Sequence, residues 1–571
     1  MDFVLTVQGF IDDLLQYPLL VMLLGTGIFL TIRLGFIQFR RLGHGLAVTM
    51  GKYDDPDDPG DVSHFQALTT ALSATVGIGN IAGVAIAIHW GGPGAIFWMW
   101  VTALLGMTTK FTEVTLAQRF RVVEEADGNR MVGTVSGGPM YYIERGLGRK
   151  FKPLAMFVAF ALMLTAFLTG NAIQANTVSD LMYAEFAIPV WATGLVTASV
   201  VALVILGGIR RIGAVTGVLA PAMAAIYVVG GLIILGINYD AVLPSLGLIF
   251  TEAFNPTAGV AGTGVGIFIQ TLLWGVRRGL FSNEAGQGSA PIAHSAAKTE
   301  EPVSEGVVAL LEPFIDTIII CTITALVVLS TGVWNQTTDT TMSLSGGDLT
   351  YVVETPEGYV EADAPPAEIR VQNGQPVAGA DGIAFAWHEV PVAQFFIDEA
   401  QTQPFSGRIV PADANAVSDE GTTYETLYGP AVESGAPLTA YGFSVGLGGL
   451  GNLIVVISVF LFGISTAISW SYYGDRCANY LFGKKAILPY KMVFVLMHFV
   501  GAVTALNTIW NLGDTALSLV TIPNVFALLL LSGVVKKLAD EYFDDFKPGI
   551  TKEEYLRIAK ERRARREEEE S

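Results

Sequence analysis

The chain has 571 residues, of which 51% are hydrophobic and only 15% are charged. Soluble globular chains carry about 25% charged residues, so this composition excludes an ordinary soluble protein and indicates one that crosses a membrane many times. The net charge of −19 argues against a nucleic-acid partner, because phosphates are neutralised by a basic surface. The two cysteines, Cys321 and Cys477, lack the spacing of a disulfide framework or a metal site.

About eleven apolar runs are long enough to cross a bilayer as helices of about 20 residues. They are centred near Leu24, Ala82, Leu104, Ala161, Ala198, Ile226, Ile269, Ile320, Val459, Val500 and Leu528. Arginines follow the first run instead of a small-residue cleavage site, so this run is predicted to be a membrane helix and not a removable signal. Lys and Arg accumulate in alternate connections, and the positive-inside rule then places the N-terminus outside and the C-terminus in the cytoplasm. The sequence therefore predicts an all-α, multi-pass protein of the cell membrane.

The predicted helices suggest an internal repeat. With the first helix set aside, ten remain, and these divide into five plus five, beginning near Ala82 and near Ile269. Because five is odd, the second set starts from the opposite side of the membrane, so the repeats must be inverted. The predicted segments are an N-terminal helix with a cytoplasmic loop, a first repeat, the start of a second repeat, an acidic insertion, the rest of the second repeat and a charged cytoplasmic tail. Their boundaries are 1–60, 61–240, 241–333, 334–440, 441–540 and 541–571.

The insertion differs in composition from the rest of the chain. Residues 334–439 include sixteen Asp and Glu but only two basic residues, Arg370 and Arg408. Stretches of alternating polarity, such as 383–387, predict short strands. We therefore expect a β-rich extracellular insertion, whose acidity serves a high-salt habitat, cation attraction near an entrance or solubility alone.

The first helix of the first repeat contains poor helix formers within an apolar run. Residues 71–83 read Ala-Leu-Ser-Ala-Thr-Val-Gly-Ile-Gly-Asn-Ile-Ala-Gly, with Gly77, Gly79 and Asn80 near the centre. A break here would expose backbone groups, which a bilayer tolerates only where they line a cavity or meet a ligand. The N-terminus of the following half-helix suits a carboxylate, and the freed carbonyls with the Asn80 side-chain oxygen suit a small cation. A packing seam of small residues is the alternative.

The first helix of the second repeat, in 270–289, carries a second irregularity. The pair Trp274-Gly275 predicts a break with an aromatic wall beside it. Three charged residues follow, which form either an intracellular gate or interface anchors: Arg277, Arg278 and Glu284. Breaks at corresponding positions of two halves favour a binding site over coincidence.

Other polar residues inside the predicted spans are candidates for the same site. Gln174 can hydrogen-bond either a polar solute or a neighbouring helix. Ser465 and Thr466 offer hydroxyl oxygens, although hydroxyls in spans commonly bond back to their own helix. Asp316 is an ionisable residue within a span and is therefore a functional candidate.

Signatures of other chemistry are missing from the sequence. It contains no phosphate-binding Gly-x-x-x-x-Gly-Lys-Ser/Thr loop, no His-Glu-x-x-His and no Gly-x-Ser-x-Gly elbow. The six histidines show no metal-ligand spacing. Lys110 and Glu113, three residues apart on one helix, are predicted to form a structural ion pair. We therefore expect neither an enzyme nor an organic cofactor.

Four strings carry a resemblance to a known family. They read Gly-Gly-Pro-Gly-Ala-Ile-Phe-Trp-Met-Trp at 91–100, Gly-Gly-Pro-Met-Tyr-Tyr-Ile-Glu at 137–144, Arg-Gly-Leu-Phe-Ser-Asn-Glu-Ala-Gly at 278–286 and Trp-Ser-Tyr-Tyr-Gly at 470–474. The chain resembles the alanine or glycine:cation symporter family of the amino acid–polyamine–organocation superfamily, from about residue 15 to 540. The third string is the most specific. The insertion is longer than the family pattern, so its role lies outside the resemblance.

The resemblance implies an inverted-repeat fold and uptake of alanine or glycine coupled to sodium or protons. It implies that the substrate is bound by Thr75, Gly77, Gly79, Asn80, Gln174, Trp274 and Gly275. It implies that a sodium ion is bound by hydroxyl and backbone carbonyl oxygens of Ser73, Val76, Phe462, Ser465 and Thr466. Trp274 would then form the wall that excludes larger side chains.

The sequence thus predicts a secondary transporter that carries a small neutral amino acid into the cell with sodium, by alternating access. Sodium would be a co-substrate and the lipid bilayer a partner. The alternatives are proton-coupled symport with Asp316 as the carrier, a passive solute channel, and a non-transporting sensor whose insertion binds a ligand.

Overall fold

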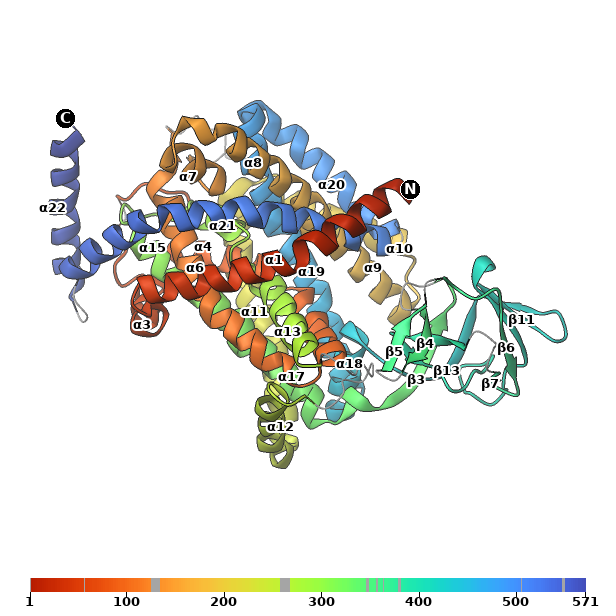
Figure 1. Ribbon diagram of the computed structural model, residues 1–571. Coiled ribbons are helices and arrows are strands. Elements are labelled where there is room, and N and C mark those ends of the chain that lie inside the picture. The colour runs from red at the N-terminus through yellow and green to blue at the C-terminus, as the bar shows by residue number, and fades with distance from the viewer. Residues whose placement is uncertain are drawn as a thin grey trace.

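The structure is a computed structural model of the full chain (Figure 1). It describes all residues except 1, 56, 125–133, 257–266, 346–348, 356–357, 363, 378–381, 505, 547–549 and 571. The described chain forms a body of helices with a group of strands beside it (Figure 1).

The α-helices are α1 (Asp2–Arg33), α2 (Ile37–Arg40), α3 (Leu42–Thr49), α4 (His64–Thr75), α5 (Val84–Gly91), α6 (Ala95–Phe120), α7 (Pro139–Gly146), α8 (Lys152–Phe167), α9 (Ile173–Phe186), α10 (Val190–Ile205), α11 (Gly208–Ile237), α12 (Tyr239–Glu252), α13 (Ile267–Asn283), α14 (Ala290–His294), α15 (Pro302–Ala309), α16 (Leu311–Pro313), α17 (Thr322–Ser330), α18 (Gly435–Leu447), α19 (Gly449–Phe482), α20 (Ile487–Val503), α21 (Leu506–Asp545) and α22 (Lys552–Glu570). The π-helical segments are η1 (Gly79–Gly83), η3 (Leu168–Ala172) and η4 (Phe314–Cys321). The strands are β1 (Val122–Val123), β2 (Val135–Ser136), β3 (Thr337–Ser343), β4 (Leu349–Thr355), β5 (Gly358–Glu361), β6 (Ile369–Gln372), β7 (Gln375–Pro376), β8 (Ile383–Trp387), β9 (Val390–Pro391), β10 (Gly407–Val410), β11 (Asn415–Ser418), β12 (Thr423–Tyr424) and β13 (Thr426–Val432).

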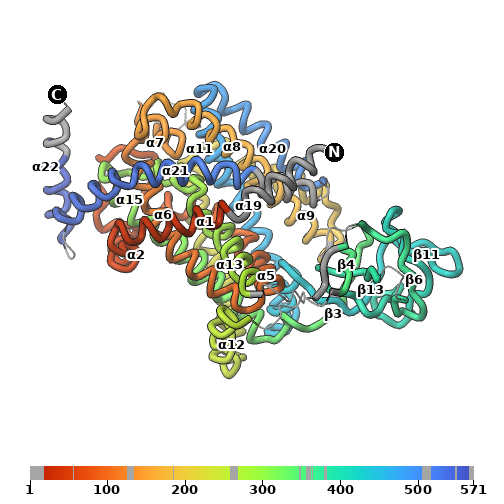
Figure 2. The backbone as a smooth tube through the Cα atoms, in the orientation of Figure 1, coloured from red at the N-terminus to blue at the C-terminus, as the bar shows by residue number. Residues whose placement is uncertain are grey.

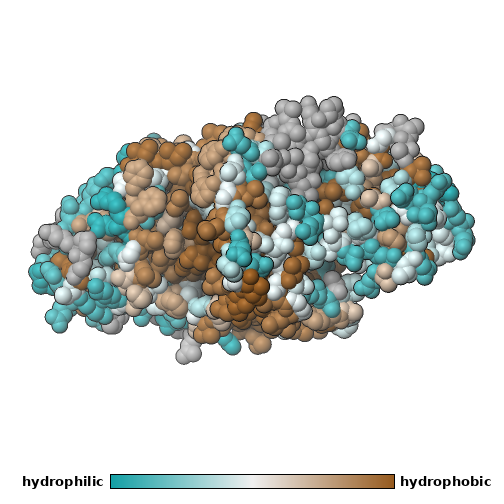
Figure 3. Space-filling view, turned by 90° about the horizontal axis from the view of Figure 1, so that it is seen from below, coloured by the Kyte–Doolittle hydropathy of each residue, from teal (hydrophilic) through white to brown (hydrophobic). Residues whose placement is uncertain are grey.

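Several helices are long and apolar enough to cross a membrane. Among the described residues these are Arg149–Tyr183, Gly208–Ile237, Pro302–Ser330, Gly449–Phe482, Lys484–Val503 and Ala516–Asp545. The pair α4 and η1–α5 adds a further candidate if it is counted as one bent span, and Pro18–Arg33 and Val190–Ile205 are shorter apolar helices. Apolar residues gather across the middle of the surface in Figure 3, with hydrophilic residues at both ends. The molecule is therefore a multi-pass membrane protein, and the count of eleven spans stays a prediction.

The strands of the acidic segment form three antiparallel sheets. Their strand orders are β12-β11-β10-β6-β7, β5-β4-β8-β9 and β13-β3. Strands β3 and β13 pair along their whole length, from Thr337 opposite Val432 to Ser343 opposite Thr426. The strands and helix α22 lie at opposite ends of the molecule, as the tube in Figure 2 also shows. The extracellular position of this strand segment remains a prediction.

The break predicted in the first repeat is confirmed. Helix α4 begins at a capping box, in which Ser63 Oγ accepts the Gln66 N–H at 3.2 Å and Gln66 Oε1 accepts the Ser63 N–H at 3.1 Å. It ends at Thr75, and Val76 is extended with φ −72° and ψ 92°. The chain resumes in η1 and α5 with a bend of 56°. The cause is local, because glycines and an asparagine follow Val76 within an apolar run.

The break predicted at Trp274-Gly275 is wrong, because α13 runs through both residues. A Cβ at Gly275 would lie 2.3 Å from the Ala95 carbonyl oxygen, so this glycine permits close packing of α13 on α6. Helix α13 ends at Asn283, and the left-handed residues Glu284 (φ 53°) and Gly286 (φ 89°) follow. The second helix therefore breaks about ten residues later than predicted, within the string that carries the resemblance.

Candidate functional site

A small central pocket lies at the break between α4 and η1. It is lined by Ala74, Thr75, Gly77, Ile78, Gly79, Thr169, Gln174, Phe281, Glu284, Gln287, Thr466, Trp470 and Leu517. The lining includes residues from both helix breaks, from the π-helical segment η3 and from α19. The cavity volume is about 20 Å³, which is room for about one water molecule. A larger ligand requires the lining to move apart, as alternating access demands.

Three polar atoms of the pocket residues have no hydrogen-bond partner within the part of the chain that the structure describes. They are Thr169 Oγ1, Gln174 Oε1 and Gln287 Oε1. Buried polar atoms are nearly always paired, so unpaired atoms around one cavity indicate that a polar ligand binds there. The Gln174 side chain is held by its own amide, which donates to the Thr169 carbonyl at 3.2 Å.

The glycines of the break provide the space of the pocket. A Cβ at Gly77 would lie 3.0 Å from Thr466 Oγ1, and one at Gly79 would lie 3.2 Å from the Phe281 ring. Thr75 also lines the pocket, and its hydroxyl donates to carbonyls of its own helix at 3.3 and 3.4 Å. The structure therefore places three of the predicted substrate-binding residues, and Gln174 with them, around one cavity.

Asn80 lies behind this cavity and is fully buried. Its Oδ1 accepts the Gly77 N–H at 2.9 Å, and its Nδ2 donates to Asp316 Oδ1 at 2.6 Å. The Asp316 carboxylate also accepts from the hydroxyls of Ser282 at 2.6 Å and Thr317 at 2.7 Å. Asp316, in η4, thus braces the break through Asn80, and direct contact of Asn80 with a ligand stays a prediction.

The predicted cation ligands meet where α19 crosses the end of α4. Thr466 Oγ1 donates to the Ser73 carbonyl at 3.0 Å, and Ser465 Oγ donates to the carbonyls of Phe462 at 3.0 Å and Ser73 at 3.5 Å. Val76 is the extended residue at the end of the same helix. Hydroxyl and carbonyl oxygens are the ligands that hard cations prefer. This set fits a sodium ion, and ion binding itself stays a prediction.

Trp274 and Gly275 lie outside the pocket lining. The Trp274 ring stacks on Trp90, with centroids 5.8 Å apart and planes at 21°. The aromatic walls of the pocket are Phe281 and Trp470 instead. Sequence reasoning missed both, although each stands in a string that carries the family resemblance. The substrate-binding roles of Trp274 and Gly275 remain untested predictions.

The second break brings two further polar residues to the pocket, Glu284 and Gln287. Glu284 Oε2 accepts from the Ser289 hydroxyl at 2.5 Å. The sequence predicts Glu284 as a gate or an interface anchor. Its place at the pocket is missed because the helix break is predicted at Trp274-Gly275 and not at Glu284. Its backbone conformation is left-handed, which sequence pattern seldom shows for a residue other than glycine.

The predicted ion pair of Lys110 with Glu113 is wrong. Lys110 Nζ pairs with Glu312 Oε1 at 2.8 Å. Glu113 Oε1 instead accepts from Asn524 Nδ2 at 2.6 Å and from the Gly288 N–H at 3.0 Å. Spacing along one helix could not reveal these partners, because they belong to distant segments that packing brings to α6.

A wider cavity of about 260 Å³ lies beside the pocket between α1, α13 and α21. The two cavities share the lining residues Phe281, Gln287 and Leu517. Arg277 and Arg278 also line the wider cavity, and the Arg278 guanidinium lies 5.4 Å from the centre of the Trp274 ring. These arginines therefore border the space next to the pocket.

The chain is similar to known proteins over most of its length. The sequence model of the sodium:alanine symporter family matches residues 1–357 and 392–556. The unmatched residues between these ranges fall within the strand segment. The chain is similar to the sodium/alanine symporter AgcS of Methanococcus maripaludis, with 40% identity over 539 residues that cover 94% of this chain and 96% of the relative.

Two relatives from Bacillus subtilis are also similar over most of their length. The putative sodium/proton-dependent alanine carrier protein YrbD is 31% identical, over 93% of this chain and 91% of its own. The probable sodium/glutamine symporter GlnT is 30% identical, over 95% of this chain and 91% of its own. The names of these relatives thus differ in the amino acid and in the ion.

Proposed function

Because the chain belongs to the sodium:alanine symporter family, we propose that it carries alanine or glycine into the cell together with sodium. The amino acid would bind in the central pocket and sodium at the junction of α4 and α19. Sodium is a co-substrate in this proposal and no organic cofactor takes part. Its N-terminus would lie outside and its C-terminus in the cytoplasm, as the basic connections predict.

One observation carries the proposal: the Ser73 carbonyl, near the end of α4, belongs both to the predicted ion site and to the helix that breaks beside the pocket. Ser73 O accepts the Thr466 hydroxyl at 3.0 Å, and Thr466 also lines the pocket. An ion held by these oxygens would fix the break whose backbone groups bind the amino acid. Binding of the ion would therefore favour binding of the amino acid, which is the coupling that symport needs.

The pocket also supports a small zwitterionic substrate. The half-helix that starts at Gly79 would offer backbone N–H groups to the carboxylate of the amino acid. The unpaired oxygens of Thr169 and Gln174 can accept hydrogen bonds from an ammonium group. Phe281 and Trp470 leave little room for a side chain, so a larger amino acid would clash.

The test is uptake of labelled alanine by purified protein in vesicles. An inward sodium gradient is expected to drive accumulation above the outside concentration, which excludes a passive channel. Competition by glycine, both alanine enantiomers, serine and glutamine then defines the substrate. Uptake that is equally fast with sodium replaced by potassium, or under a proton gradient alone, would contradict sodium coupling.

Thr466→Ala removes one hydroxyl from the predicted sodium site. We expect the sodium concentration for half-maximal uptake to rise at least about tenfold, since loss of a ligand or its support typically costs that much in ion affinity. Thr49→Ala is the matched control, because Thr49 is a buried threonine whose hydroxyl donates to Gly45 O of its own helix. An unchanged sodium dependence in Thr466→Ala would place the ion elsewhere.

A further inference from the structure

A row of acidic and basic side chains leads from the central pocket to the protein surface. Its members, in spatial order, are Glu284, Lys110, Glu312, His294, Glu305, His64 and Asp54. Glu284 lines the pocket, and the Asp54 side chain is 42% exposed in the loop before α4. The five residues between them are at most 4% exposed. We refer to these seven residues as the buried relay.

Three of the six links in the buried relay are hydrogen-bonding contacts, namely Lys110–Glu312, His294–Glu305 and Glu305–His64. Lys110 Nζ lies 2.8 Å from Glu312 Oε1, and Glu312 Oε2 lies 3.7 Å from His294 Nε2. His294 Nδ1 lies 2.5 Å from Glu305 Oε1, whose other oxygen contacts His64 Nδ1. These contacts connect α4 and α6 with α14, α15 and α16, which follow one another within 290–313.

The two ends of the buried relay complete the connection. His64 Nε2 lies 3.8 Å from Asp54 Oδ1 at the surface end. At the pocket end, Lys110 interacts electrostatically with both Glu284 and Glu113. Each imidazole presents one ring nitrogen to each of its neighbours, which is the arrangement that passes a proton through a histidine.

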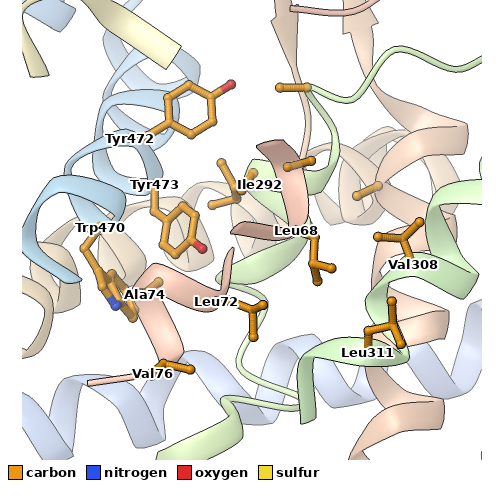
Figure 4. Packing of buried hydrophobic residues seen from close by; sticks show 14 of the residues in the cluster. Leu68, Leu72, Ala74, Val76, Ile292, Val308, Leu311, Trp470, Tyr472 and Tyr473 are labelled. Atoms are coloured by element: carbon orange, nitrogen blue, oxygen red, sulfur yellow. The ribbon is translucent and has the colours of Figure 1, made fainter. Parts of the chain in front are cut away.

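The surroundings of the buried relay are apolar. Leu68, Leu72, Ile292, Val308 and Leu311 come from the same elements and pack closely, as Figure 4 shows. The relay side chains are therefore enclosed by packed helices, apart from Asp54 at the surface end.

The charges of the buried relay do not balance. Four buried carboxyl groups lie in this region, those of Glu113, Glu284, Glu305 and Glu312. The buried cations are Lys110, His64 and His294, so one carboxyl group is in excess even when both imidazoles are protonated. An uncompensated buried charge is costly, which favours one carboxyl group that keeps its proton.

Other titratable groups face the buried relay without removing this excess. Arg121 faces Glu305 at the surface end, where Asp58, Asp61 and Glu300 compensate it. Further groups near the relay are uncharged phenols or another acid: Tyr142, Tyr473 and Asp316.

We propose that the buried relay conducts one proton from Glu284 to the surface at Asp54 when the amino acid occupies the pocket and sodium the junction of α4 and α19. This inference rests on the proposed function, because the arriving cation is what favours the ionised form of Glu284. The transporter would therefore exchange a proton with solvent in each cycle, in addition to its cargo.

The step conserves atoms and electrons. Lys110 gives one of its N–H protons to Glu312 and takes the proton of Glu284 in its place, so the O–H bond of Glu284 breaks as an N–H bond of Lys110 re-forms. His294 releases a proton from Nδ1 to Glu305 and takes the one from Glu312 on Nε2. His64 releases a proton from Nε2 to Asp54 and takes the one from Glu305 on Nδ1. At the end Glu284 is a carboxylate, one proton has entered water, and every group between them has its starting number of protons.

The test measures how many protons the protein releases when it binds sodium and alanine. Sodium and alanine are mixed with purified protein in weakly buffered solution that contains a pH indicator dye, and release of about one proton per protein is expected. Glu284→Gln, tested at sodium and alanine concentrations that saturate this variant by its own measured affinities, should release none. A wild-type protein that takes up alanine with sodium and releases no proton on binding overturns the buried relay alone. A protein that fails to take up alanine overturns the proposed function, and the relay with it.

The route is tested by interrupting it. His294→Gln replaces an imidazole by an amide, which does not relay protons, and should slow proton release at least tenfold without changing alanine affinity. His44→Gln is the matched control, since His44 lies outside the buried relay, and should release the proton at the wild-type rate. Release at the wild-type rate from His294→Gln overturns the route. If His294→Gln does not fold, Glu284→Gln and the wild-type count still decide.

Discussion

At Gly77 a backbone group, and not a side chain, makes the hydrogen bond that holds the broken segment. Its N–H donates to Asn80 Oδ1 at 2.9 Å, so the broken segment is held although the helical hydrogen bond is lost. A Cβ at this residue would lie 3.0 Å from Thr466 Oγ1 and 4.0 Å from Gln174 Oε1. Because Gly77 has no side chain, a space remains between the predicted ion site and the predicted substrate site.

Gly77→Ala should fill that space. The added methyl group meets the Thr466 hydroxyl too closely, and overpacking of this kind costs about 1–3 kcal/mol. We expect alanine uptake in vesicles to fall at least about tenfold while sodium still protects the protein against thermal unfolding. Gly25→Ala is the control, since nothing lies within 4 Å of a Cβ there. Normal uptake by Gly77→Ala would show that the substrate binds away from the break.

At the scale of elements, the sequence predicts one of the two helix breaks and misplaces the other. The first lies at Gly-x-Gly-Asn, where several poor helix formers stand together, so the local signal is strong. In the second helix, Gly275 gives the same signal but serves packing against α6. The actual break has Glu284 in a left-handed conformation, which tertiary contacts impose and a sequence pattern does not reveal.

The residues of the candidate site are likewise predicted only in part. Residues next to the first break, such as Thr75 and Gly79, and Gln174 within a span, were identified from local sequence and resemblance and do line the pocket. The aromatic walls Phe281 and Trp470 were missed, because an aromatic side chain in an apolar span looks like any core residue until the packing is known.

The packing of α3 on α21 should depend on pH through His44. His44 Nε2 and Tyr542 Oη are 2.9 Å apart, and burial, with Arg41 and Lys52 nearby, lowers the pKa of His44 to about 4. Because this value is below the ordinary 6.5, the stability from the neutral imidazole is complete above about pH 6.5 and is lost as the pH falls toward 4. The loss reaches up to about 3 kcal/mol.

His44→Gln tests this dependence. At pH 7.5 the wild type should unfold at a higher temperature than the variant, and the gap should shrink or reverse at pH 4.5. Thermal unfolding of both proteins in detergent measures it. A gap that is constant across this range would show that His44 does not titrate with unfolding.

At the scale of the whole molecule, the apolar middle of the surface in Figure 3 lies between two hydrophilic ends, one helical and one built of strands. Helix α22 lies at one end and the strand segment 337–432 at the other (Figure 1). The strand segment contacts α5 at His89, whose Nε2 lies 2.9 Å from the His388 carbonyl oxygen and whose ring centre lies 6.0 Å from that of His388. None of its described residues lines the central pocket. Its fold follows from the alternation of polarity that the sequence shows, whereas its place beside α5 depends on contacts that no local pattern encodes.

Removal of most of the strand segment should leave transport intact. Ser343 and Thr426 are directly opposed in β3 and β13, so an Asn-Gly turn in place of residues 344–425 closes a hairpin. We expect sodium-driven alanine uptake within threefold of the full chain. His89→Gln in the full chain separates loss of the His388 contact from loss of the strands. A folded but inactive deletion would favour a ligand-sensing role for the segment.

The pairing of β3 with β13 also bears on how such a segment is acquired. Its first and last strands run side by side, so the chain leaves the helices and returns to them at nearly the same point. A segment whose two ends lie side by side can be inserted at one end of the molecule without moving the helices that flank it. A lineage can therefore gain or discard it in a single genetic event, and the surrounding helices need not be rebuilt.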